Sequence, residues 1–199
     1  MKISCLTLTL LLALHFPFLV FGQAMTVIGG DKKAQECFDN AEYAAKKLPG
    51  VSRSLKEPCD FALEYSSISL ADRAATYSNR GIILAANQQL DSAMSDYEKA
   101  MKLRPSTAEI YVNRGNAYFL NRDYVMALED YEASVALGIR QLHFVQYNMG
   151  MTYEKLGNDT AAEQMFRSAL EIEPGWELVE NRLSLLLERL QEDRQSRND

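Results

Sequence analysis

The sequence predicts an all-α fold: a helix-turn-helix solenoid of about three hairpins, with a helical cap at the N-terminal end and a capping helix at the C-terminal end. Two observations lead to this prediction. A segment of about 34 residues occurs three times in tandem, over residues 74–107, 108–142 and 143–176. Glycine, small and aromatic residues recur at matching offsets within the three copies. Self-similarity at such a period is typical of repeat arrays, in which each repeat is one supersecondary unit.

Each copy has the pattern of two helices that pack together. Glycine stands midway along the first helix, where it costs about 1 kcal/mol of helix propensity relative to alanine, and this indicates close approach by a neighbouring helix. A small residue opens the second helix, and an aromatic residue follows four positions later on the same face. The glycines are Gly81, Gly115 and Gly150, the small residues Ala93, Ala127, Ala162, Ala100, Ser134 and Ala169, and the aromatic residues Tyr97, Tyr131 and Phe166.

This pattern resembles the tetratricopeptide repeat (TPR) family. The resemblance covers residues 74–174, about half of the chain. Pro105 and Pro174 end the first and third copies as in the family, whereas Gly138 and Ile139 stand at that place in the second copy. Three copies in register make the resemblance specific for the fold. The family's repeats are binding platforms with many unrelated partners, so the resemblance implies a protein or peptide partner without naming it.

Length and composition fit one domain with a sizeable core. The chain has 199 residues, of which 47% are hydrophobic and 24% are charged, and its formal net charge is -6. An acidic chain lacks the basic footprint of a nucleic-acid-binding protein. The same charge argues against docking on an anionic membrane surface.

Residues 1–24 have the pattern of a secretory signal peptide. Lys2 supplies a positive charge, and residues 3–21 are almost wholly apolar. Gly22 and Ala24 place small residues three before and one before a cut after Ala24. This predicts a periplasmic or secreted protein with no stable membrane insertion after cleavage. The alternative is an uncleaved membrane anchor, because the apolar run is close to spanning length.

The stretch between the signal peptide and the repeats is expected to hold a flexible leader, residues 25–35, and a degenerate repeat that acts as a cap, residues 36–73. Pro58 suits the first turn of a helix in this cap. One repeat period before Ala93 lies Cys59, a small residue at a small-residue position. Terminal repeats of such arrays are atypical. An autoinhibitory arrangement, with the leader in the protein's own groove, stays open.

Cys37 and Cys59 are the two cysteines that remain after removal of residues 1–24. An even count in an exported chain predicts a disulfide. A simple hairpin would leave the two residues offset by about 12 Å along the helix axis, so the loop between them must fold back along the first helix. A redox-active pair lacks CxxC spacing, and a metal site lacks nearby histidines.

Residues 177–199 are expected to form a capping helix and a charged tail. Leu183, Ser184 and Leu187 match the first helix of a further repeat that has no second helix, which is typical of a cap over the open end of a stack. Two interpretations remain. The helix caps the array only, or its outer face, with Val179 and Leu186, also docks a second copy of the chain.

Asn79, Asn113 and Asn148 occupy one place in the three first helices, 34 and 35 residues apart. We expect them to form a column on the concave face, which the first helices line. An asparagine side chain offers a donor and an acceptor, so it can pair with a peptide backbone of any sequence. In the family such columns hold peptide backbones. The alternative is that these asparagines are repeat consensus without a ligand.

Apolar side chains are expected beside this column. They could form a patch for a partner, or they could pack beneath neighbouring helices. Besides the three column residues, the predicted peptide site contains Asn116, Val112, Tyr147 and Met151, with Phe119, Leu120 and Phe144 nearby.

Two other kinds of site are disfavoured. Some relatives grip a C-terminal carboxylate with lysine, asparagine and arginine side chains, and this chain has Ser78, Ile82, Phe144 and Asn148 at the corresponding positions. No nucleophile motif, phosphate loop or metal-ligand spacing is present. Arg80 and Arg114, each of which follows a column asparagine, are expected to form salt bridges within the protein. The sequence predicts a protein that is not an enzyme and binds no cofactor or metal.

The functional prediction is a scaffold or adaptor that binds a peptide or protein segment in its concave groove outside the cytoplasm. The alternative is a structural assembly subunit that dimerises or docks through the C-terminal helix.

Overall fold

The computed structural model describes residues 23–47 and 50–196, so residues 1–22 of the expected signal peptide and residues 197–199 of the expected tail lie outside the described part. Within it the chain forms helices and no strand, which confirms the predicted all-α class. The elements are α1 (Lys32–Lys47), a 3-10 turn η1 (Arg53–Lys56), α2 (Glu57–Tyr65), α3 (Leu70–Ala86), α4 (Leu90–Leu103), α5 (Ala108–Leu120), α6 (Tyr124–Ala136), α7 (Leu142–Lys155), α8 (Asp159–Ile172) and α9 (Glu177–Ser196).

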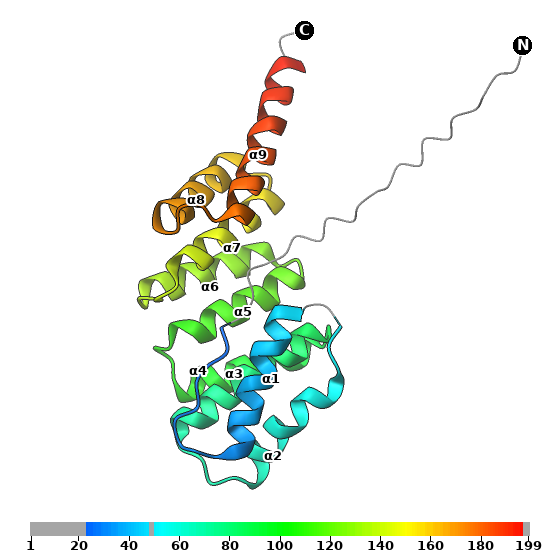
Figure 1. Cartoon of the computed structure of the whole chain (residues 1–199), viewed down its shortest axis with the longest axis vertical. Coiled ribbons are helices and arrows are strands. Elements are labelled where there is room, and N and C mark those ends of the chain that lie inside the picture. The colour runs from blue at the N-terminus through cyan, green and yellow to red at the C-terminus, as the bar shows by residue number, and fades with distance from the viewer. Residues whose placement is uncertain (1–22, 48–49, 197–199) are drawn as a thin grey trace, which may run out of the picture.

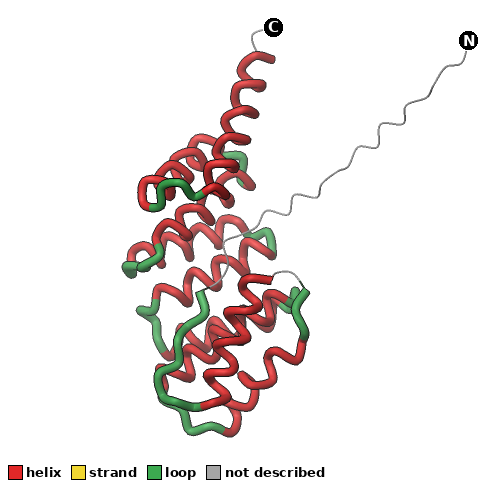
Figure 2. Tube along the Cα trace, in the orientation of Figure 1, coloured by secondary structure: helices red, strands yellow, loops and turns green. Residues whose placement is uncertain are grey.

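The helices stack as hairpins along one axis (Figures 1 and 2). The pairs α3 with α4, α5 with α6 and α7 with α8 are the three predicted repeats. α1 and α2 lie at one end of the stack, and α9 projects from the other. None of the helices in the described ranges is long and apolar enough to cross a membrane.

Each repeat is held together by contact between the glycine of its first helix and the aromatic ring of its second. A Cβ added to Gly81 would lie 2.5 Å from the Tyr97 ring, and one added to Gly115 would lie 2.7 Å from the Tyr131 ring. Phe166 stands against Gly150 in the same way. These separations are far shorter than ordinary van der Waals contact, so only glycine lets the two helices pack at this distance.

Ion pairs join the two helices of the first two repeats, as expected for Arg80 and Arg114. Arg80 Nε lies 2.6 Å from Asp96, and Arg114 Nη2 lies 2.7 Å from Asp130. Burial raises the pKa of the Asp130 carboxyl group, and the hydrogen bond and charge of Arg114 oppose that rise. Both arginines therefore join helices within the protein, and Arg80 also links its repeat to α2 through Asp60 at 2.7 Å.

The turn after the second repeat closes without proline. Gly138 has φ of 79° and donates to the Val135 carbonyl, while Ile139 donates to the Ser134 carbonyl. This is a Schellman motif, which ends a helix at a left-handed glycine. The glycine thus replaces the proline of the other two copies.

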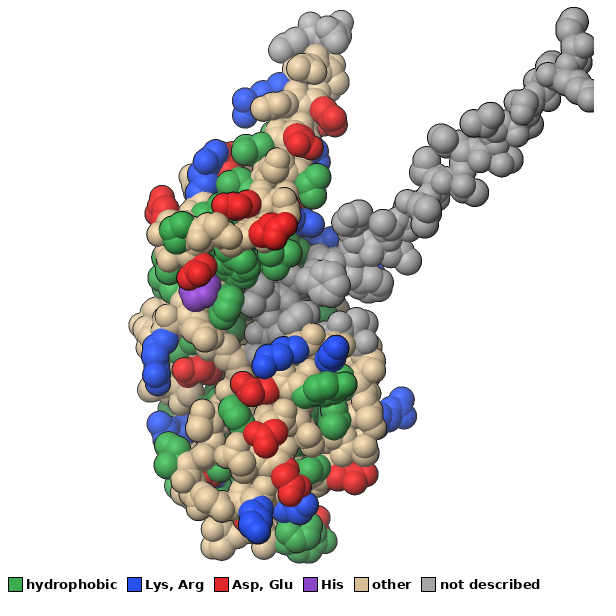
Figure 3. All heavy atoms as spheres, viewed as in Figure 1, with side chains coloured by type: hydrophobic (Ala, Val, Ile, Leu, Met, Phe, Trp, Pro, Cys, Tyr) green, Lys and Arg blue, Asp and Glu red, His purple; other side chains and the backbone are tan. Residues whose placement is uncertain are grey.

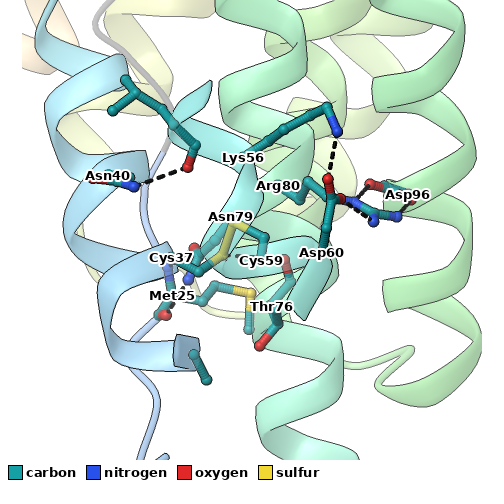
Figure 4. Close-up of a disulfide and its surroundings, with 12 residues drawn as sticks. Met25, Cys37, Asn40, Lys56, Cys59, Asp60, Thr76, Asn79, Arg80 and Asp96 are labelled. Carbon is teal, nitrogen blue, oxygen red and sulfur yellow. Dashed lines mark hydrogen bonds and ion pairs between the residues drawn. A yellow bond between two sulfur atoms is a disulfide. The ribbon is translucent and has the colours of Figure 1, made fainter. Parts of the chain in front are cut away.

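A disulfide joins Cys37 of α1 to Cys59 of α2, with their Cα atoms 4.8 Å apart (Figure 4). The loop between them folds back along α1 in the way that the spacing required. Asn40, about one turn beyond Cys37, donates its side-chain N–H to the carbonyl of Leu55 at 2.9 Å. The return of residues 50–56 along α1 cancels the axial offset of a simple hairpin.

α9 covers the last repeat with one apolar face. Val179, Leu183 and Leu186 are buried in the cluster that also contains Phe166 of α8. Just before α9, the Trp176 ring packs edge-on against Phe144 of α7, with ring centroids 5.2 Å apart. The helix closes the open end of the array, and the burial of Val179 and Leu186 in this core shows that the expected outer docking face cannot consist of these two residues.

Candidate peptide-binding groove

The first two column asparagines each hold one residue of the segment before α1. This segment, residues 23–30, is called the leader from here on, and it includes Gln23 and Ala24 of the expected signal peptide. Asn113 accepts from the Gln23 N–H at 2.7 Å and donates to the Gln23 carbonyl at 3.0 Å. Asn79 accepts from the Met25 N–H at 2.7 Å and donates to the Met25 carbonyl at 2.8 Å. Figure 4 shows Asn79 beside Met25. Within this segment the two side chains bond only to backbone atoms, and Asn113 also donates to Ser78 Oγ at 3.0 Å.

The register is two leader residues per repeat. Asn79 and Asn113 stand at the same place in neighbouring repeats, and the residues that they hold, Gln23 and Met25, are two apart. Alternate residues of an extended chain point their backbone groups the same way. The column therefore has the spacing of an extended peptide.

The leader is anchored further at its end near α1. The Ile28 N–H donates to Asp72 Oδ1 at 2.8 Å, and the Ser69 hydroxyl donates to the other oxygen of this carboxylate at 2.8 Å. A Cβ on Gly29 would overlap the Asp72 carboxylate, so the backbone passes directly over it. Val27 is buried with Ala75 of α3, whereas the Ile28 side chain is 86% exposed. Instead of a free segment over residues 25–35, the structure has a docked strand-like segment, followed by α1 from Lys32.

The leader runs against the order of the repeats. Its start lies at Asn113 of α5, its middle at Asn79 of α3, and its end at Asp72 in the first turn of α3. Figure 1 draws it in blue, alongside the stack and ahead of α1. A peptide bound in the same way would have its C-terminal end toward α1.

Asn148, the third column residue, is linked to the second repeat. Its side-chain N–H donates to Asn116 Oδ1 at 2.9 Å, and the Tyr131 hydroxyl donates to the same oxygen at 2.7 Å. Asn116 is 7% exposed, and the nitrogen of its side-chain amide has no hydrogen-bond partner among the described residues. Burial raises the pKa of Tyr131 well above its ordinary value. Asn116 is thus a buried donor beside Asn113, one helical turn farther along α5.

The apolar residues predicted beside the column do not form an exposed patch. Val112, Tyr147 and Met151 are buried and belong to the core cluster of the second and third repeats. Tyr147 packs against Trp176 at 5.4 Å between ring centroids, and burial raises its pKa to about 12. These three side chains are therefore part of the core of the second and third repeats.

A hollow of about 740 Å³ lies beside the leader, between α1, α3, α5 and the start of α7. Gln23, Ala24 and Met25 form one of its walls. Its charged lining side chains are Lys46, Arg104, Arg140, Glu42, Asp72 and Glu109. The side chains thus bring equal numbers of positive and negative charges. Figure 3 shows acidic and basic groups interspersed on the visible face.

No cluster of three or more metal-ligating side chains occurs in residues 23–47 and 50–196. Sequence reasoning found the asparagines and left open that the leader occupies the groove, but it did not assign which leader residues they hold. Residues 25–30 carry no helical periodicity, and the contacts that fix them are to backbone atoms, which leave no mark on side-chain identity.

Family sequence profiles match the repeats. One described as TPR repeat matches residues 81–121, and one described as tetratricopeptide repeat matches residues 106–173. The chain is a TPR protein. TPR domains are as a rule protein–protein interaction modules, so the family indicates a role in protein binding.

Solved TPR structures share the fold. The MamA RS-1 ArsTM double mutant is 18% identical with a TM-score of 0.61, covering 81% of this chain and 86% of that one. The first TPR domain of human RPAP3 is 24% identical with a TM-score of 0.58, covering 63% of this chain and 98% of that one. The second TPR domain of human RPAP3, in complex with the HSP70 peptide SGPTIEEVD, is 22% identical with a TM-score of 0.54, covering 59% and 98%. Among curated proteins none matches this TPR protein.

Proposed function

We propose that this TPR protein is a non-catalytic scaffold or adaptor that binds an extended segment of a partner protein in the groove lined by its asparagine column. The observation that carries the proposal is the pair of hydrogen bonds that Asn79 and Asn113 each make to one backbone residue. These bonds support the proposal, because the same side-chain donor and acceptor can pair with the backbone of any extended peptide. The peptide complex of the RPAP3 domain supports a groove ligand of this class.

Partner capture by the native protein tests the proposal. The mature protein is crosslinked in its native envelope or secretion fraction and purified with its partner. Asn113→Ala is the test variant, and Asn121→Ala at the C-cap of the same helix is the matched control, since Asn121 is exposed and its side chain bonds only to Asp123 among the described residues. We expect the partner to be lost with Asn113→Ala and kept with Asn121→Ala, while circular dichroism shows both folded. A partner kept by both variants places its site outside the groove.

We further propose that the protein works outside the cytoplasm, in the periplasm or as a secreted protein. The apolar run of residues 3–21 and the Cys37–Cys59 disulfide support this location, because structural disulfides persist in oxidising compartments. Alkylation of thiols in intact cells, followed by mass spectrometry of the purified chain, tests both features. The proposal predicts a first residue of Met25 and unmodified cysteines. Alkylation of both Cys37 and Cys59 on a chain that keeps residues 1–24 would refute it.

One observation favours a second candidate, assembly through α9. Leu178 and Leu185 are 40% and 56% exposed and stand seven residues apart on that helix, a heptad spacing that suits helix pairing. Light scattering with concentration-dependent mass, abolished by Leu185→Glu, would support a homodimer. A mass that stays monomeric at every concentration excludes it.

A further inference from the structure

We propose that the Met25 α-ammonium, created when the chain is cut after Ala24, completes a subsite for the C-terminal carboxylate of an extended peptide held at Asn113. The inference rests on the proposed groove function and deepens it, because it specifies which end of a partner the groove accepts. It needs no carboxylate-binding side chains from the repeats, which lack them at Ser78, Ile82, Phe144 and Asn148.

The cut divides the docked leader into two unequal parts. Hydrolysis by a signal-type endopeptidase adds one water across the Ala24–Met25 peptide bond, leaving a carboxylate on Ala24 and an ammonium on Met25. Met25 stays in place because Asn79 holds its nitrogen and carbonyl, Val27 is buried, and Ile28 donates to Asp72. Gln23 and Ala24 lose their covalent link to this anchor. The high effective concentration that kept Gln23 at Asn113 is lost with it.

The vacated position keeps the features that bind a backbone. The Asn113 side chain regains its oxygen acceptor and one amide proton for a peptide, while the bond from the same amide nitrogen to Ser78 Oγ, 3.0 Å long, continues to hold it in place. A peptide that follows the former course of Gln23 and Ala24 runs toward Met25. Its last residue then stands where Ala24 stood, next to the new ammonium.

The charge at this position favours a carboxylate. The lining side chains of the adjoining hollow balance, with Lys46, Arg104 and Arg140 against Glu42, Asp72 and Glu109. The ammonium of Met25 therefore makes the net charge around the hollow positive. Its bond to Asn79 uses one of its three protons, so two remain for a carboxylate. Asp72 is already occupied by the Ile28 N–H and the Ser69 hydroxyl.

The test uses the chain from Met25 to Asp199, with its first residue verified by mass, and a six-residue probe with the sequence of residues 19–24, LVFGQA. One form of the probe ends in a free carboxylate and the other in an amide. We expect the carboxylate form to bind about fivefold more tightly at pH 6.5, as for a partly screened ion pair. The ratio should fall toward one as the pH rises past about 8, where an α-amino group loses its proton.

Acetylation restricted to the Met25 amine, at a pH where the lysine amines stay protonated and with the modified site verified by peptide mapping, supplies a matched protein. Acetylation should abolish the preference for the carboxylate form without abolishing binding of the amide form, and Asn113→Ala should weaken both forms. Equal affinity for the two forms, with both lost in Asn113→Ala, would overturn the carboxylate inference and leave the groove function standing. Binding of neither form, or binding unaffected by Asn113→Ala, would count against the inference and the groove function together.

Discussion

The two ends of the solenoid are closed by different means. At the N-terminal end, the buried residues of α1 are small: Ala34, Cys37, Ala41, Ala44 and Ala45. At the C-terminal end, α9 buries Val179, Leu183 and Leu186. A buried leucine or valine contributes about 1.5–3 kcal/mol and alanine far less. The small-residue interface is supplemented by a disulfide and by the docked leader, whereas the large-residue interface needs neither.

The difference also bears on function. Small side chains let α1 approach α3 closely, and the leader fits along that side of the groove, with Val27 packed beside Ala34 and Ala75. The N-terminal cap thus shapes the end of the groove where the leader is anchored. The C-terminal cap takes Tyr147 and Met151 into the core instead. The N-terminal cap builds part of the candidate site, and the C-terminal cap closes the stack.

The largest expected effect tests the apolar C-terminal cap. Leu186→Ala should lower the free energy of unfolding by about 2–5 kcal/mol, because it removes a fully buried side chain and leaves a cavity. Leu185→Ala is the matched control at the neighbouring, exposed position, and it should change the free energy of unfolding by less than about 0.5 kcal/mol. Urea unfolding followed by circular dichroism measures both. Equal effects would mean that α9 does not hold the last repeat through this face.

The next effect tests the covalent N-terminal cap. Replacing Cys37 and Cys59 together by serine should lower the free energy of unfolding by about 3 kcal/mol, since the disulfide closes a loop with a sequence separation of 22. A reductant should destabilise the wild type by a similar amount and leave the double variant unchanged. If reduction has no effect on the wild type, the small-residue interface is sufficient without the bond.

A smaller effect concerns the ionic contacts of α9. Glu154 of α7 is buried and lies 2.6 Å from Arg182, so Arg182→Gln should cost about 1–3 kcal/mol by weakening the partner of a buried carboxylate. Arg167→Gln breaks the exposed pair with Glu163 and should cost less than about 0.5 kcal/mol. The same urea experiment compares them. If the two variants lose the same free energy of unfolding within error, the apolar face of α9 alone closes this end of the stack.

The smallest effect on stability concerns the leader. Gly29→Val should push the leader away from Asp72, because any side chain there overlaps the carboxylate. We expect a loss of about 1 kcal/mol at most, since the repeats themselves are untouched. Limited proteolysis, read by mass spectrometry, should find faster cleavage within residues 25–30 than in the wild type. Unchanged cleavage would mean that Asp72 does not anchor this segment.

The repeat fold could be predicted from sequence because its signals are local and recur. Gly81 and Tyr97 are in one hairpin, and the same pair returns as Gly115 and Tyr131. The three asparagines were found in the same way. The leader's course could not be predicted, because backbone hydrogen bonds to Asn79 and Asn113 are independent of leader side chains. The burial of Met151 depends on how closely successive repeats stack, which the spacing within one repeat does not determine.

The central claim is that the asparagine column holds alternate residues of an extended backbone, and amide hydrogen exchange in the uncleaved chain tests it most directly. The Gln23 and Met25 amides donate to Asn113 and Asn79, whereas no hydrogen bond from the Ala24 or Thr26 amide to a described residue occurs. NMR should find slow exchange at Gln23 and Met25 and fast exchange at Ala24 and Thr26. Asn79→Ala should remove the protection of Met25, and Asn113→Ala that of Gln23. Equally fast exchange at all four amides, or protection that survives both substitutions, would contradict the account.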